Sequence, residues 1–227
     1  SDIAAFGLPA VSDRSSFMGS IVSALYHSIA PKGTLMMPAF SYSFSKNEIF
    51  DTDTQSTVGA LTEYFRKMKH VVRTKQPNHS VCMLGENIVS IKIGSHSFDD
   101  RSLFGILRRR NAKLVFFGTS LEKACTFAHH PEFNSSVPYR YPIEQKGLVK
   151  EGTKTHVYTA HLTKKYAFFI TDLRPLEDEA RKVGILKEAR FGAGTIQVVN
   201  TVELYDLCMN KIKDNPYFLI RNSGIYK

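Results

Sequence analysis

Short apolar runs alternate with segments of helical periodicity along this chain, and this alternation limits its fold more than any other feature. The strand-sized apolar runs cover residues 34–40, 81–84 and 113–118. Apolar residues recur at helical spacing over residues 15–30, 102–110 and 201–213. Helices between short strands are typical of α/β layers around a sheet. Two later β-rich runs, 153–160 and 165–170, favour a mixed sheet over a purely parallel one.

Two intervening segments carry weaker signals. We expect Thr57 to be the N-cap of a helix that runs to about Met68, because a threonine precedes a run of helical spacing. Residues 119–141 are predicted to form a loop, since no clear period extends through them.

Size and composition place the chain among ordinary globular proteins. With 227 residues it can bury one sizeable core, so a single domain over residues 1–227 is expected. No apolar run approaches the ~20 residues needed to span a bilayer, and residues 1–8 show no secretory signal. The three cysteines are scattered without a Cys-x-x-Cys pair, which disfavours a disulfide framework or a structural zinc site. These features predict a cytoplasmic protein without a membrane span.

The formal net charge of +9 favours anionic partners, which are nucleic acid, an anionic membrane surface or phosphorylated small molecules. The dense basic run at residues 108–110 follows apolar residues that share one helical face. Cations in the last turn of a helix complement its dipole without any ligand. The chain has none of the common nucleic-acid-binding motifs. We therefore expect no nucleic-acid partner.

Residues 126–132 hold the densest cluster of titratable groups, directly after a predicted strand and turn. His129 and Glu132 are three residues apart, which places them on the same face of a helical turn. A carboxylate so placed can fix the tautomer of the imidazole and raise its basicity. The pattern alone also fits an ordinary polar loop or a metal site, although no third ligand stands nearby. Pro131 biases the preceding residue away from helix, so the aim of the two side chains stays open at this point.

Other catalytic patterns are weaker. Cys125 lies four residues before His129, which leaves a cysteine–histidine pair open, but buried cysteines are usually inert. No Gly-x-Ser-x-Gly elbow is present, and the glycines at 192 and 194 do not complete a phosphate-binding loop.

Six motifs in a fixed order carry a family resemblance. They are SDIAAFG at 1–7, GTLMMPAFS at 33–41, TVGALTEYFR at 57–66, VR with PNHSV at 72–81, DRSLF at 100–104 and TFAHHPE at 126–132. Together they resemble the aminoglycoside 3-N-acetyltransferase family, which includes relatives with polysaccharide-related substrates. This chain opens inside the first of these motifs, whereas family members usually have a helix and a strand before it.

The resemblance implies a fold, a cosubstrate and a site. The fold is an α/β three-layer sandwich with a mixed β-sheet flanked by helices, distinct from the commoner GNAT superfold, whose signature the chain lacks. The cosubstrate is acetyl-coenzyme A, with direct transfer to an amine and no metal. His129 is then the general base and Glu132 its carboxylate partner. The implied coenzyme A contacts are Ser1, Asp2, Arg73, Ser80 and Val81, with Lys75 beside Arg73 for the phosphates.

The acceptor is judged from charge. Aminoglycosides are polycations, and a protein with a net charge of +9 repels them at long range. We therefore expect a less cationic amino-sugar, such as one carried on a nucleotide for polysaccharide biosynthesis, with aminoglycoside resistance as the alternative. A catalytically inactive anionic-ligand-binding module and an acyl hydrolase are further readings, and a homodimer is possible in each. The candidate acceptor contacts are Phe40, Tyr42, Asp99 and Tyr139.

Overall fold

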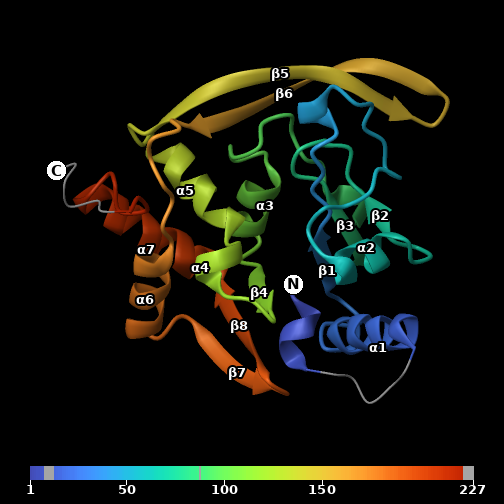
Figure 1. Ribbon diagram of the computed structural model, residues 1–227, viewed down its shortest axis with the longest axis horizontal. Coiled ribbons are helices and arrows are strands. Elements are labelled where there is room, and N and C mark those ends of the chain that lie inside the picture. The colour runs from blue at the N-terminus through green and yellow to red at the C-terminus, as the bar shows by residue number, and fades with distance from the viewer. Residues whose placement is uncertain (8–12, 87, 222–227) are drawn as a thin grey trace. The chain divides into compact units, whose positions relative to one another are not determined.

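The computed structural model describes residues 1–7, 13–86 and 88–221, which form helices and antiparallel sheets (Figure 1). The α/β class is therefore confirmed. The chain divides into two compact units, which are described one by one. The first unit contains Ser1–Ile3, Gly7–Ser95 and Glu144–Ala160, and the second contains Ala4–Phe6, His96–Ile143 and the chain from His161 on. The single-domain expectation stays a prediction.

The first unit is built on a three-stranded antiparallel sheet. Its elements are α1 (Arg14–His27), β1 (Thr34–Pro38), η2 (Phe44–Lys46), α2 (Ala60–Arg66), β2 (Val72–Arg73), β3 (Val81–Gly85) and η3 (Ile88–Ser90). The strand order is β1-β3-β2, with Met36 opposite Met83 and Arg73 opposite Cys82. Asp13 caps α1, because its carboxylate accepts hydrogen bonds from the backbone N–H groups at the helix start. The fully buried aromatic side chains of this first unit, Phe44, Phe50 and Phe65, lie in its hydrophobic core.

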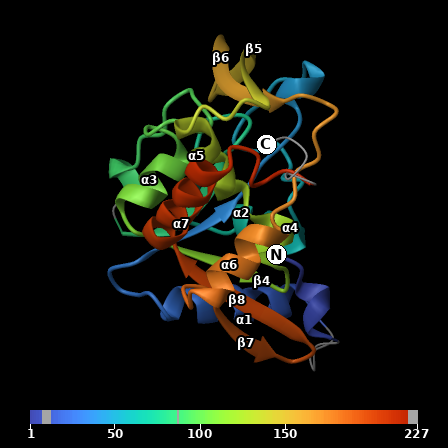
Figure 2. The same ribbon diagram turned by 90° about the vertical axis from the view of Figure 1, so that its left-hand side faces the viewer.

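The second unit is built on another three-stranded antiparallel sheet, with the order β4-β8-β7. Its elements are α3 (Leu103–Arg109), β4 (Lys113–Phe117), α4 (Leu121–Ala124), η4 (Thr126–Ala128), α5 (His129–Asn134), α6 (Arg174–Lys182), β7 (Lys187–Phe191), β8 (Gly194–Asn200) and α7 (Thr201–Asp214). Helices α3 and α5 both pack against α7, and α4 packs against α6 (Figure 2). The short helix η1 (Ile3–Phe6) places the Phe6 ring against Phe117, with ring centroids 4.5 Å apart.

A long hairpin has residues in both units. Its strands are β5 (Arg140–Glu151) and β6 (Lys154–Lys165), and Gly152 at the turn has a φ of +61°. A glycine adopts this left-handed conformation without steric cost. Parallel pairing in the described residues occurs as isolated bridges, one between Phe50 and Val149 and one between His96 and His161.

The strongly periodic predictions are confirmed: residues 15–30 cover all of α1 except its first residue, 102–110 contain α3, and 201–213 form most of α7. The apolar runs at 34–40 and 113–118 contain β1 and β4, and the run at 81–84 covers all of β3 except its last residue. No helix in the described part of the chain combines the length and the apolar character that crossing a bilayer requires.

Three local predictions are wrong. The second helix begins at Ala60 after Gly59, whose φ is +119°, so Thr57 is not its N-cap. Residues 119–141 contain α4, η4 and α5, which are too short to show a helical period. Of residues 165–170 only Lys165 belongs to a strand, and β5 instead forms over Arg140–Glu151, where exposed and less exposed residues alternate.

Candidate active site

The chain reaches His129 through three short elements after β4. Helix α4 ends at Ala124, η4 spans Thr126–Ala128, and α5 begins at His129. Pro131 is therefore in the first turn of α5, where a backbone N–H would have no partner within the helix. For this reason Pro131 is compatible with the helical turn and does not separate His129 from Glu132.

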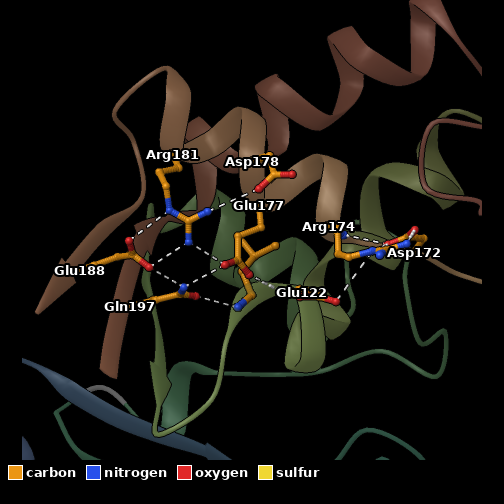
Figure 3. A network of polar contacts seen from close by, with 9 residues as sticks. Glu122, Asp172, Arg174, Glu177, Asp178, Arg181, Glu188 and Gln197 are labelled. Atoms are coloured by element: carbon orange, nitrogen blue, oxygen red, sulfur yellow. Dashed lines mark hydrogen bonds and ion pairs between the residues drawn. The ribbon is translucent and has the colours of Figure 1, made fainter. Parts of the chain in front are cut away.

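The start of α4 is held from outside the helix. Ser120 occupies the N-cap position without a side-chain capping bond. Instead, Leu121 N–H donates to Gln197 Oε1 and Glu122 N–H donates to Glu177 Oε2, both over 2.7 Å. Figure 3 shows this network, in which Glu177 and Gln197 also contact Arg181 and Glu188. Side chains of α6 and β8 thereby fix the helix that leads to His129.

His129 and Glu132 form a close pair, as their spacing predicts. The Nδ1 atom of His129 lies 2.6 Å from Oε2 of Glu132. The Glu132 side chain is 0% exposed, whereas that of His129 is 24% exposed. The Phe98 ring packs edge-on against the imidazole, with centroids 5.4 Å apart. The pair thus joins a buried carboxylate to a ring that solvent and a substrate can reach.

Two further side chains surround the Glu132 carboxylate. The Tyr139 hydroxyl donates to Oε1 over 2.7 Å, and Arg140 Nε lies 2.8 Å from Oε2 as an ion pair. Tyr139 is fully buried, and the Arg140 side chain is 8% exposed. We call His129, Glu132, Tyr139 and Arg140 the catalytic cluster.

The electrostatics of the catalytic cluster keep Glu132 ionised. Burial alone would raise the pKa of Glu132, but the charges and hydrogen bonds of His129, Arg140 and Tyr139 outweigh it and lower that pKa. Burial, together with the adjacent Glu132 carboxylate, raises the pKa of Tyr139 far above its usual range. The tyrosine is therefore a permanent hydrogen-bond donor to the carboxylate.

An ionised Glu132 defines the useful tautomer of His129. A carboxylate only accepts, so a hydrogen bond between them requires a proton on Nδ1. This leaves a lone pair on Nε2, and no group in the described ranges bonds to that atom. The arrangement can take a proton from a substrate, as a general base must.

Of the predicted acceptor contacts, Tyr139 and Asp99 lie in the same unit as the catalytic cluster. Tyr139 points its hydroxyl at Glu132 and has no exposed surface, which argues against direct contact with a sugar. Asp99 follows Phe98 directly, and its carboxylate accepts from Arg101 N–H over 2.9 Å. Arg140 was not singled out from the sequence, because its contacts with His129 and Glu132 join residues on different elements.

The predicted coenzyme A contacts Arg73, Ser80 and Val81 are buried in the first unit. The Arg73 guanidinium donates to the Ser80 hydroxyl over 3.1 Å and to backbone carbonyls of Ala39, Thr52 and Thr54. Its remaining face lies over the Phe50 ring, 5.0 Å from the centroid. These contacts occupy the guanidinium, so the geometry argues against a role of Arg73 in holding phosphates.

Tyr42 and Ser1, two other predicted contacts, lie at or near a cavity of about 910 Å³ in the first unit. Tyr42, which is 63% exposed, lines this cavity, and the backbone of Ser1 approaches Gly59 at its wall. Phe40 packs edge-on against His79 instead, and Asp2 is exposed. The charged residues of the wall are Arg14, Lys46, Glu48, Glu63 and Lys67. The volume suits a small-molecule site.

Two alternative kinds of catalytic site, a reactive cysteine and a metal centre, were also considered for the described residues. Cys125 is buried, and burial raises the pKa of its thiol to about 12, so it is not a ready nucleophile. No group of three or more His, Cys, Asp or Glu in residues 1–7, 13–86 and 88–221 is arranged to hold a metal ion.

His130 points away from the catalytic cluster into the core. It is fully buried, and its Nδ1 lies 2.7 Å from the Phe98 carbonyl, to which it donates. Its Nε2 has no hydrogen-bond partner within the described residues, and Asp100 Oδ1 lies 3.9 Å away. Burial lowers the pKa of His130 below the ordinary value of 6.5.

We expect the free energy of unfolding to fall as the pH drops below about 6.5. The unfolded chain then binds a proton that folded His130 refuses, so stability is complete above that pH and decreases toward the lower folded pKa. Urea unfolding between pH 8 and 5 measures the slope. His130→Phe should flatten it, whereas His156→Gln, at an exposed position on β6, should not. Equal slopes in wild type and His130→Phe would contradict this assignment.

Several solved structures share this fold. AAC-IIIb in a binary complex with CoASH has a TM-score of 0.75 at 15% identity, covering 87% of this chain and 83% of that chain. AAC-VIa bound to sisomicin has a TM-score of 0.76 at 13% identity, covering 94% and 89%. Aminoglycoside acetyltransferase AAC(3)-Xa has a TM-score of 0.76 at 17% identity, covering 96% and 85%. At these identities the likeness shows the fold, and this fold is not GNAT.

No curated protein matches the chain. The model of the family described as aminoglycoside 3-N-acetyltransferase, however, matches residues 10–213, which is most of the chain. The resemblance found in the six motifs is thereby confirmed, and this chain belongs to the aminoglycoside 3-N-acetyltransferase family.

Proposed function

We propose that this protein transfers the acetyl group of acetyl-coenzyme A to an amino group of a sugar, with His129 as the general base. The observation that carries this proposal is the buried Glu132 carboxylate on Nδ1 of His129, which leaves Nε2 of a partly exposed ring free to take a proton. Membership of an N-acetyltransferase family supports the reaction class.

The catalytic cluster handles the proton of the reaction. A sugar amine is mostly protonated at neutral pH, and attack on a thioester requires that it lose a proton. Solvent takes that proton, and His129 Nε2 then takes a second proton from the neutral amine while a bond forms between the amine nitrogen and the acetyl carbon. The carbon–sulfur bond breaks, the sulfur leaves as a thiolate, and the imidazolium can return the proton to it. Glu132 stabilises the imidazolium, and a base so placed contributes about 10²–10⁴-fold.

The acyl donor is acetyl-coenzyme A, whose thioester supplies the activated acetyl group. The AAC-IIIb structure with CoASH supports this assignment. In this chain the cavity of the first unit fits such a ligand in volume and has three cationic side chains on its wall, Arg14, Lys46 and Lys67. We propose that these cations, and not the buried Arg73, meet the phosphates.

For the acceptor we propose an amino-sugar with little positive charge, such as a nucleotide-linked one. The net charge of +9 repels polycations at long range, and the Arg140 guanidinium does the same beside the base. Such an acceptor would place the protein in cytoplasmic polysaccharide synthesis. Family membership favours the second candidate, which is an aminoglycoside.

Release of the coenzyme A thiol, measured with a panel of amines, tests both the acetyl transfer and the proposed acceptor. We expect kcat/KM for a uridine-diphosphate-linked amino-sugar to exceed that for sisomicin by about tenfold or more, which corresponds to about 1.4 kcal/mol. Added salt should narrow the difference, since it screens charge. Preference for sisomicin at all salt concentrations would show that the charge argument is wrong. An absence of thiol release with every amine would refute the enzymatic function.

A further inference from the structure

A short loop, residues 96–99, lies against the start of α5. The Phe98 ring packs edge-on against the His129 imidazole, and the Phe98 carbonyl accepts a hydrogen bond from His130 Nδ1 over 2.7 Å. Phe98 therefore contacts two successive residues of α5, and it is itself buried. The position of this loop thus affects the orientation of the imidazole that the catalytic cluster uses.

The His96 side chain closes the loop from within. Its Nδ1 atom accepts hydrogen bonds from two backbone N–H groups, that of Phe98 over 3.0 Å and that of Asp99 over 3.1 Å. Asp and Asn side chains commonly close short loops in this way, by accepting from a backbone N–H group two residues ahead. In this chain an imidazole nitrogen takes the place of that side-chain oxygen.

The surroundings of His96 favour the form of the ring that can accept. The ring packs against Phe133 of α5, with centroids 4.4 Å apart, and lies parallel to the His161 ring of β6 at 6.5 Å. Burial lowers the pKa of His96 below its ordinary value of 6.5, against the opposing charge of Asp99 and with a smaller contribution from His161. At neutral pH the ring therefore has a lone pair, and the two N–H donors require it on Nδ1.

We propose that His96 is a positioning residue for His129, because its Nδ1 atom holds the loop that places Phe98 against the imidazole. The proposal rests on the proposed function for its effect on acetyl transfer, but the loop and its contacts exist in the free protein. Without the acceptor, two N–H groups lose their partner and the loop is free to move away from α5. The His129 ring then loses a packing contact, and its Nε2 is aligned with the amine less often.

Two substitutions separate the acceptor from the ring. His96→Asn keeps an acceptor, because its Oδ1 is bonded to Cγ just as Nδ1 is, but it removes the ring. His96→Phe keeps a ring that can pack against Phe133 and removes the acceptor. We expect His96→Phe to lower kcat for thiol release by about tenfold to hundredfold, the loss that a misplaced catalytic group causes. His96→Asn should recover most of this loss, and KM for acetyl-coenzyme A should stay near wild type in both.

Amide hydrogen exchange in the free protein measures the loop directly. In His96→Phe the Phe98 and Asp99 amides should exchange about fivefold faster than in wild type, which matches the net contribution of one hydrogen bond. In His96→Asn they should exchange at nearly the wild-type rate. Exchange in α3 should not change in either variant, because Ser102 caps that helix through its own hydroxyl.

The outcomes separate this proposal from its alternatives. If His96→Phe keeps wild-type kcat on the folded protein and only unfolds at a lower urea concentration, His96 stabilises the fold without positioning the base, and the proposal is wrong. It is also wrong if His96→Asn loses as much activity as His96→Phe, because the ring and not the acceptor would then be required. If His96→Phe does not fold, His96→Ala replaces it. Wild type without thiol release would refute the proposed function, whereas the exchange rates would still test the hold of His96 on the loop.

Discussion

His129→Asn should lower kcat for acetyl transfer by about 10²–10⁴-fold, the contribution expected of a positioned general base. Asparagine keeps a polar group near Glu132 but has no nitrogen that can take the amine proton. Because the change leaves the cavity wall of the first unit intact, binding of coenzyme A should persist. Thiol release gives kcat, and isothermal titration with coenzyme A gives the affinity.

A matched variant controls for the loss of a histidine elsewhere. His156→Asn changes an exposed residue of β6 and should retain wild-type kcat. A binding module without catalysis would retain coenzyme A affinity in His129→Asn and show no turnover in either form. Full activity in His129→Asn would remove His129 from the mechanism.

Glu132→Ala should lower the free energy of unfolding by about 3–5 kcal/mol, because it removes one member of a buried ion pair. The Arg140 guanidinium would lose the carboxylate 2.8 Å from its Nε, and the Tyr139 hydroxyl would lose its acceptor. Burial prevents water from replacing either contact fully. Urea unfolding measures the change, and thiol release on the still-folded protein measures the loss of the oriented base.

Two variants separate charge from shape. Glu132→Gln can still accept from Tyr139 but cannot neutralise Arg140, so its stability should lie between wild type and Glu132→Ala. Glu203→Ala removes a carboxylate from the start of α7 that accepts from Asn200, at an exposed contact, and should have a much smaller effect. If Glu132→Ala and Glu203→Ala unfold at the same urea concentration, the carboxylate does not stabilise the catalytic cluster.

The part of the catalytic cluster that the sequence could reveal is the part set by local geometry. His129 and Glu132 are three residues apart, so one helical turn brings them together whatever the rest of the chain does. Arg140 reaches the same carboxylate from the start of β5, and that approach depends on where the hairpin begins. Sequence spacing carries no information on such a contact. The mechanism inferred from His129 and Glu132 alone therefore lacked the positive charge of Arg140 beside the Glu132 carboxylate.

The motif comparison singled out Arg73, but as a contact for the phosphates of coenzyme A and not as a buried residue. It lies opposite Cys82 in the sheet, with its guanidinium among backbone carbonyls of a loop. The sequence around an arginine does not distinguish a side chain that is exposed and can bind a phosphate from one that is buried under a loop. Burial decides between the two, and burial is a property of the assembled sheet.

The secondary-structure elements also fall into those that the sequence reveals and those that it does not. Helices of seven or more residues with an apolar face, such as α3 and α7, follow from periodicity. Helix α6, with the sequence RPLEDEARK, has only two buried apolar residues on one face, Leu176 and Ala180, which are too few to establish a period, and it also forms ion pairs such as Arg181 with Glu177. Elements of four to six residues, such as α4 and α5, are too short for a period to be visible.

The external cap on α4 has a consequence for synthesis of the chain. Leu121 and Glu122 obtain the acceptors for their N–H groups from Gln197 and Glu177, which leave the ribosome some 55 to 76 residues later. Until then the first turn of α4 has no side-chain cap, and the segment that leads to His129 is not fixed. A nascent chain that stops before β8 would therefore contain every residue of the catalytic cluster, but the cluster would not yet be ordered. The base is ordered only after β8 has been translated, when these long-range contacts form.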